Sequence, residues 1–264
     1  MKILPLTLFA ILLSCILSCN ITNNVHLPRQ DVHYFSGKGE LNSIAGIELN
    51  NYSTGFNLNG NYSVTNNFYI NGGVNYYFNS NLWAKNISEG LRVTTSEGFD
   101  LKGTSFQLGL GMYSNMNNYN YFEAGFQCSK GNNILKTTES STTPNKYVWR
   151  YKPVMLTAKV SIGKNKKRCG ISFLTNIDFI HFGEKIPYQY GNLINVNYGP
   201  DREIYDNYIL NSLFITPALY IRVGGGHFKW ISSVGIAFNC SDLSKICYQE
   251  PIFKICTGIL YDFK

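Results

Sequence analysis

The chain is built from long segments in which apolar residues alternate with Gly, Asn, Ser or Thr. Beyond residues 1–18 it has no apolar stretch that approaches the roughly 20 residues needed to cross a bilayer as a helix. Period-two alternation is typical of a β-strand with one apolar and one polar face. In the clearest segment, 68–78, one face carries Phe, Ile, Gly, Val and Tyr, and the other mainly Asn, Gly and Tyr. The sequence therefore indicates a protein made of strands.

Ten segments show this pattern and are expected to be strands: 41–49, 56–64, 68–78, 106–112, 122–128, 154–162, 171–179, 215–223, 228–238 and 253–263. The turns after the second, fourth, sixth and eighth segments are short, with Asn66-Asn67 expected as a tight turn of left-handed Asn residues. The connections after the third, fifth and seventh are long, at about 80–102, 129–146 and 184–208. Short turns at one rim and long loops at the other are typical of transmembrane β-barrels.

The low charge content decides which face of these strands points outward. Charged residues make up only 15% of the chain, against about 25% in ordinary soluble domains. A barrel in lipid is apolar outside and polar inside. The sequence therefore predicts an all-β fold, a closed antiparallel up-and-down transmembrane β-barrel of about ten strands, in residues 37–264. A small outer-membrane pore and a soluble periplasmic ligand-binding barrel remain open as alternatives.

The N-terminus has the features of an export signal. Lys2 precedes an apolar run from Ile3 to Leu17, and the run ends at Ser18-Cys19, which predicts a signal peptide over 1–18. Ile16-Leu17-Ser18-Cys19 resembles the bacterial lipobox, which implies that Cys19 is lipidated, with Cys15 as the alternative. Residues 19–36 are then expected to be a lipidated linker. The parity of the turns puts both ends of the barrel at the short-turn rim, which agrees with a lipid in the inner leaflet.

Four motifs carry a resemblance to a known family: Cys19, the opening Gly37-Lys38-Gly39-Glu40-Leu41, the Asn-rich hairpin after Tyr62-Ser63-Val64-Thr65, and the ending Tyr261-Asp262-Phe263-Lys264. With them, most of the mature chain resembles the small outer-membrane β-barrel proteins of Bacteroidetes-type bacteria, many of which are lipoproteins. The resemblance implies a location in the bacterial outer membrane, contact with outer-membrane lipid and insertion by the barrel-assembly machinery. Lys264 departs from the aromatic C-terminal residue that this machinery recognises.

Eight charged residues fall on the polar face of the expected strands or at its margin: Glu40, Glu48, Glu123, Lys159, Asp178, Arg222, Lys229 and Lys254. Both signs occur, and a charge in a narrow lumen needs a partner or water. We therefore expect a salt-bridged interior rather than a selective channel. The net charge of +7 does not predict a nucleic-acid partner, because the basic residues are scattered apart from a cluster at 164–168 in an expected turn.

No group of residues in the sequence predicts catalysis, a metal site or a cofactor. Asp178 and His181 lie three apart on a strand and so face opposite ways. Asp31-Val32-His33 falls in the linker, expected on the periplasmic side. We therefore expect a non-enzymatic protein that contacts a surface or binds a ligand through its extracellular loops. The Tyr- and Asn-rich loop 184–208 could bind a glycan or a protein.

The cysteines of the mature chain show no zinc-binding spacing. Cys128 and Cys169 fit the pattern as small apolar residues on strands. Cys240 and Cys247 flank a six-residue loop, and export permits their oxidation. A disulfide between these two is therefore expected, and a count of free thiols in the purified protein would test it.

Replacing the lipidated residue tests the lipobox. Cys19→Ala should abolish incorporation of a fatty-acid analogue, because the modified thiol is removed. The measurement is metabolic labelling followed by gel analysis. Labelling that persists in the variant would assign the lipid anchor to Cys15 or rule out the lipobox.

Overall fold

The computed structural model describes residues 27, 31–50, 53–79, 98–116, 119–138, 146–181, 186–188, 211–240 and 252–263. The expected signal peptide and Cys19 lie outside these residues. The described strands are β1 (Leu41–Asn50), β2 (Ser53–Ser63), β3 (Phe68–Asn79), β4 (Gly98–Asn115), β5 (Asn120–Thr138), β6 (Lys146–Tyr151), β7 (Val154–Asn165), β8 (Cys169–His181), β9 (Ile186–Tyr188), β10 (Asn211–Gly225), β11 (Phe228–Asn239) and β12 (Ile252–Phe263). Among the described residues, none forms a helix long and apolar enough to cross a membrane.

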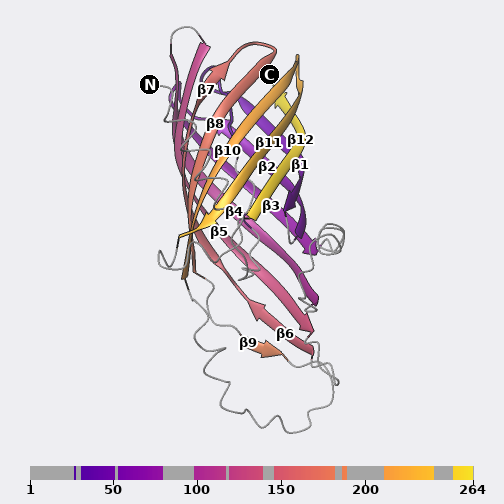
Figure 1. The fold of residues 1–264 in the computed structure, drawn as a ribbon. Helices are drawn as coiled ribbons and strands as arrows, with labels where there is room; N and C mark the ends of the chain where they lie inside the picture. The colour runs from indigo at the N-terminus through magenta and orange to yellow at the C-terminus, as the bar shows by residue number, and fades with distance from the viewer. Residues whose placement is uncertain are drawn as a thin grey trace, which may run out of the picture.

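Ten of these strands close into an antiparallel ring (Figure 1). Neighbours in the chain pair with one another, and the ring is sealed where β1 pairs with β12 from Leu41 opposite Phe263 to Asn50 opposite Lys254. β4 pairs with β5 along its whole length, and β5 continues the ring to β7. The predicted fold class, a closed up-and-down barrel of about ten strands, is confirmed.

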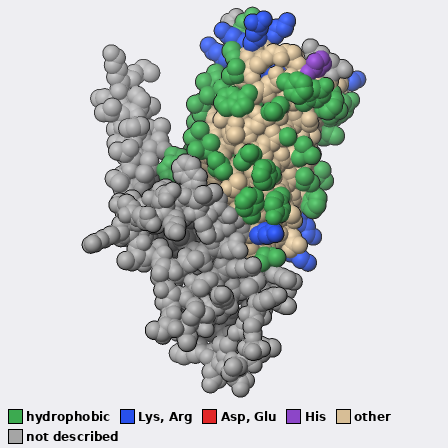
Figure 2. Space-filling view, turned by 90° about the vertical axis from the view of Figure 1, so that its right-hand side faces the viewer, with side chains coloured by type: hydrophobic (Ala, Val, Ile, Leu, Met, Phe, Trp, Pro, Cys, Tyr) green, Lys and Arg blue, Asp and Glu red, His purple; other side chains and the backbone are tan. Residues whose placement is uncertain are grey.

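The apolar faces of the strands point outward. Phe106, Leu108 and Phe126 are 66%, 73% and 70% exposed, although each sits in the middle of a strand. Hydrophobic side chains are spread over the described wall that faces the viewer, with Lys and Arg at its two ends (Figure 2). The polar faces point inward, so Asn59, Ser161 and other small polar residues are buried. An apolar outer face this large belongs in lipid rather than in water.

The sheet extends beyond the barrel on one side. β4 begins at Gly98 and β5 runs to Thr138, so parts of the expected loops 80–102 and 129–146 are strand instead. β6 pairs with the far half of β5, and the short β9 pairs with β6, inside the expected loop 184–208 (Figure 1). Along β5 the alternation of apolar and polar residues in the sequence ends near Lys130. That is why the sequence pattern missed this extension.

The turn between β2 and β3 forms without left-handed Asn residues, so that expectation was wrong. Thr65 Oγ1 accepts hydrogen bonds from the backbone N–H groups of Asn67 and Phe68, at 3.2 and 3.0 Å. Among the described residues other than Gly, a positive φ occurs only at Tyr34 and Tyr119. The Thr65 hydroxyl therefore provides the hydrogen bonds that stabilise this turn, a role expected of Asn66-Asn67.

Pro217 lies in the middle of β10, opposite Thr175 of β8. The β10–β11 ladder skips Thr216 and Pro217 and resumes in the same register at Ala218. The ring therefore tolerates the lost N–H of proline by leaving out pairs on one side, without shifting its strands.

The segment before β1 runs through the bore of the barrel. We call it the inner segment, Leu27 with residues 31–36. Leu27 is 2% exposed and Phe35 is 0% exposed, and both pack against inward-facing side chains of the wall. The expectation that Asp31 and His33 lie in a linker on the periplasmic side was wrong. A run of six residues has too little periodicity to show that it fills a cavity made by strands far away in the sequence.

Introducing a charged residue on the outer face tests whether that face contacts lipid. Leu108 lies midway along β4, and a Lys or Arg at the midplane of a bilayer costs about 2–4 kcal/mol in a barrel, against about 0–1 kcal/mol near the interface. We therefore expect Leu108→Lys to lower the free energy of unfolding in lipid vesicles far more than Phe228→Lys, which sits beside a turn. Equal effects of the two substitutions in urea unfolding would instead favour a soluble barrel.

Candidate functional site

The centre of the bore holds a buried ionic cluster that joins the wall to the inner segment. Glu123 of β5 is fully buried, and its Oε1 lies 2.6 Å from Lys159 Nζ of β7 and 2.7 Å from His33 Nδ1. The backbone N–H of His33 donates to Glu123 Oε2 at 3.0 Å. Lys159 Nζ also donates to the carbonyl oxygen of Asp31 at 2.9 Å. One wall carboxylate and one wall ammonium therefore hold both the backbone and a side chain of the inner segment.

The wall strands place these groups by their alternation. Tyr121 and Glu123 both point inward from β5, and the Tyr121 hydroxyl donates to Glu123 Oε2 at 3.0 Å. The Tyr69 ring of β3 packs on His33 with centroids 4.5 Å apart, and Lys159 Nζ lies 5.2 Å from the centroid of the same ring. Aromatic rings thus cover the ionic cluster and exclude water from it, which strengthens its charge interactions.

A ladder of amide side chains extends from the inner segment across the wall. Asn59 Nδ2 donates to Asp31 Oδ2 at 3.1 Å. Gln107 Nε2 donates to Asn59 Oδ1 at 2.6 Å, and Gln127 Nε2 donates to Gln107 Oε1 at 2.8 Å. The ladder crosses β2, β4 and β5, so the Asn-rich inward faces bind the inner segment by hydrogen bonds as well as by charge.

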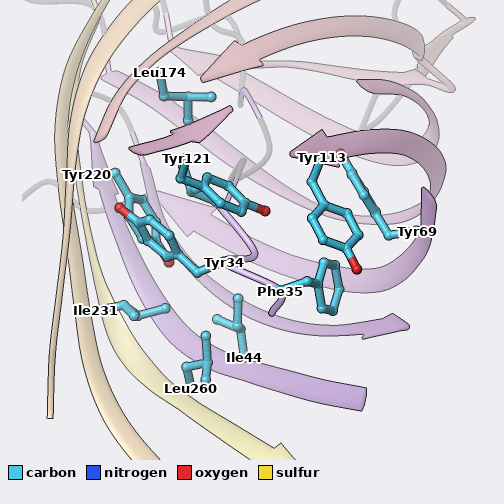
Figure 3. Close-up of a cluster of buried hydrophobic side chains, with 11 residues drawn as sticks. Tyr34, Phe35, Ile44, Tyr69, Tyr113, Tyr121, Leu174, Tyr220, Ile231 and Leu260 are labelled. Atoms are coloured by element: carbon cyan, nitrogen blue, oxygen red, sulfur yellow. The ribbon is translucent and has the colours of Figure 1, made fainter. Parts of the chain in front are cut away.

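Towards the short-turn rim, aromatic side chains fill the bore (Figure 3). Tyr34 packs on Tyr121 and Tyr220, and its hydroxyl lies 2.7 Å from Ser172 Oγ. Phe35 packs on Tyr69 and Tyr113. These aromatic contacts come from four strands and two residues of the inner segment, so they reach across the bore.

Gly170 of β8 makes room for the inner segment. A Cβ at this position would lie 2.9 Å from Tyr34 Cζ, closer than real contacts allow. Tyr34 itself has φ 53°, a conformation that a bulky side chain rarely adopts. Such a residue persists only where its surroundings hold it in place. The wall therefore has a slot shaped for Tyr34.

At the opposite end of the bore, Lys254 of β12 holds Leu27. Its Nζ lies 2.9 Å from Glu48 Oε1 and donates to the carbonyl oxygen of Leu27 at 2.6 Å. The Leu27 side chain packs in a buried cluster with Tyr77, Met155, Ile180, Phe214, Ala237 and Ile252, residues from the ends of their strands. The inner segment is thus bound at both ends and at its centre.

The structure buries six of the eight charged residues singled out in the sequence, namely Glu48, Glu123, Lys159, Asp178, Arg222 and Lys254. Asp178 accepts a hydrogen bond from Thr157 at 2.6 Å. Arg222 donates to Asn165 Oδ1 at 2.5 Å and lies over the Tyr34 ring, 4.8 Å from its centroid. Not every buried charge is therefore held by a charge of opposite sign.

The other two charged residues, Glu40 and Lys229, lie at the short-turn rim and are only partly buried. Glu40 accepts a hydrogen bond from the backbone N–H of Ser36 at 2.8 Å, and Lys229 forms an ion pair with Asp262. Their positions next to turns leave them open to water, a difference that alternation along a strand does not reveal.

Sequence reasoning missed the residues of the inner segment, Asp31, His33, Tyr34 and Phe35. The sequence holds only an indirect sign of an inner segment: inward-facing glycines such as Gly170 leave space that the wall does not fill. Asp31, His33 and Glu123 bring acid and base groups together, but they are 4%, 2% and 0% exposed. Other side chains also hold them: Lys159 and Tyr121 contact Glu123, and Asn59 donates to Asp31.

The remaining candidates lie partly outside the described residues. Cys240 Sγ donates to the Phe238 carbonyl oxygen at 3.6 Å. Cys247 is not among the described residues, so the disulfide stays a prediction. Most of the loop 184–208 is also outside them. Within the described part of the chain, no group of three or more His, Cys, Asp or Glu side chains could hold a metal ion.

The closed ring, its apolar outer face and its polar bore define the class of this protein, a transmembrane β-barrel of the outer-membrane kind. No protein-family model matches the chain, and no curated protein matches it.

Several solved structures resemble it. The translocator domain of autotransporter NalP from Neisseria meningitidis is 9% identical with a TM-score of 0.45, over 86% of this chain and 89% of that one. The KdgM porin is 14% identical with a TM-score of 0.38, over 84% and 99%. The outer membrane protease OmpT from Escherichia coli is 9% identical with a TM-score of 0.40, over 86% and 94%. At such identities the likeness concerns the fold alone.

Neutralising Glu123 tests the ionic cluster. Glu123→Gln keeps the side-chain shape but leaves Lys159 buried without its carboxylate, and breaking a buried pair in this way costs about 3–5 kcal/mol. Urea unfolding in detergent micelles should show this loss. Adding Lys159→Met should restore part of the stability, because the uncompensated charge is removed as well.

The rim pair provides the control. Lys229→Met breaks the ion pair with Asp262, and such a partly exposed pair contributes at most about 1 kcal/mol. A loss of stability in Glu123→Gln no larger than in Lys229→Met would show that the ionic cluster does not hold the bore together.

Proposed function

We propose that the protein is a closed, non-enzymatic outer-membrane β-barrel lipoprotein, a surface scaffold rather than a diffusion pore. Its long connections, including the loop 184–208, would contact an extracellular glycan or protein. The single observation that carries the proposal is the inner segment, which runs through the bore and is bound there by wall residues.

The closed bore argues against passive transport. Ten strands enclose an interior little wider than that of eight, which side chains can fill. Here the wall supplies Tyr69, Tyr113, Tyr121 and Tyr220, all at most 1% exposed, and the inner segment occupies the space between them. A solute would have to displace the inner segment together with its buried ion pairs.

The extended sheet supports a role at the surface. β6 and β9 lengthen the wall at the end opposite the short turns, beyond the apolar band of the ring (Figure 1). Short turns are periplasmic in bacterial barrels, so this extension would stand outside the cell. It provides a hydrogen-bonded sheet from which the long connections extend, as expected of a protein that presents loops to a partner.

Conductance distinguishes the proposed function from the alternative, a pore. Purified full-length protein should give no steady channels in planar bilayers, because the bore is filled. A variant lacking residues 27–36 should insert and conduct, since the wall alone leaves the path of the inner segment empty. A mobility shift between unboiled and boiled samples confirms that each protein is folded.

A second variant guards against misfolding of the deletion. Gly170→Val should displace Tyr34 and increase the number of channel events. Gly60 faces outward, and a Cβ there would have no heavy atom within 4 Å, so Gly60→Val should produce no channel events. Steady channels of uniform size from the unmodified protein would overturn the proposed function in favour of a pore.

A further inference from the structure

The inner segment has a direction, and this direction determines where the chain before it emerges. Leu27 lies at the level of Lys254, which pairs with Asn50 at the end of β1. At the other end, Asn115 Nδ2 donates to the Phe35 carbonyl oxygen at 2.9 Å, beside the turn that follows β4. The backbone N–H of Lys38 donates to Asn66 Oδ1 in the β2–β3 turn at 3.0 Å. Followed towards the N-terminus, the chain thus passes from the short-turn rim to the long-loop end.

We propose that the barrel presents its own N-terminus outside the cell, with the lipid of Cys19 in the outer leaflet. This inference rests on the proposed function, which supplies the membrane and the lipid. It replaces the inner-leaflet position that the parity of the turns suggested. That parity places Leu41 and Phe263 at the short-turn rim, but the chain before Leu41 turns back into the bore.

The reach of the chain excludes a return to the inner leaflet. Cys19 lies eight residues before Leu27, and at roughly 3.3–3.6 Å per residue these span at most about 29 Å. The hydrocarbon core of a bilayer is about 30 Å thick, and the chain would first have to climb over the strand ends. The bore already holds the inner segment, so the return path would lie in lipid.

A path through lipid is excluded by a second argument that does not depend on length. An extended chain in hydrocarbon would expose unpaired N–H and C=O groups, which only helices and closed barrels avoid. The same argument covers lipidation at Cys15. Either lipid is therefore confined to the side of the membrane that faces the long loops.

Cysteine labelling with a membrane-impermeant maleimide tests the proposal in intact cells. Asn23→Cys reports on the chain before Leu27, Asn192→Cys on a long connection and Asn66→Cys on a short turn, and all three exchange Asn for Cys. The background carries Cys240→Ser and Cys247→Ser, and the parent without a new Cys gives the baseline. A heat-dependent mobility shift shows that each variant is folded.

We expect Asn23→Cys to be labelled in intact cells as strongly as Asn192→Cys. Asn66→Cys should stay near the baseline and rise severalfold once the outer membrane is permeabilised. If Asn23→Cys instead follows Asn66→Cys, or if only Asn66→Cys is labelled in intact cells, the proposal is overturned. Conductance by the unmodified protein would sink the closed-bore function without changing this labelling pattern, so the two failures can be told apart.

Discussion

In hydrocarbon an unpaired backbone N–H or C=O is too costly to leave exposed, and the whole structure depends on this constraint. A sheet in lipid must close, which is why β1 meets β12 along ten consecutive residue pairs. Closure in turn assigns the two faces of every strand. The apolar face can only lie in lipid, so Asn, Ser, Glu and Lys are forced into the bore.

The bore then has a packing problem of its own, because polar side chains on the wall need partners and the central space needs filling. The inner segment solves both. Its carbonyl groups accept from Lys159 and Lys254, and its His33 meets Glu123. Its aromatic residues occupy space that small residues such as Gly170 leave free. The inner segment is therefore as much a part of the core as the strands around it.

Much of the wall could be predicted from the sequence, because in-and-out alternation follows directly from the geometry of a strand. Lys159 and Glu123 were assigned to the bore from that alternation. It could not reveal the protruding part of β5, where the alternation in the sequence ends, nor separate the rim position of Lys229 from the interior. Alternation could not predict the position of Tyr34. Residues 31–36 form no ladder, and strands up to nearly two hundred residues away hold them in place.

The seam between β1 and β12 joins the two ends of the barrel, and the inner segment is continuous with one of them. Once the seam has closed, the inner segment can enter or leave the bore only lengthwise. During assembly the wall must therefore either curl around a segment already lying against it, or seal first and draw the N-terminus through afterwards. In the first case Glu123 and Lys159 gain their partner before the last strand docks, which makes the N-terminus a template for the curvature of the sheet. The time at which β1 pairs with β12 thus decides whether the wall closes around the inner segment or the inner segment is threaded into a closed barrel.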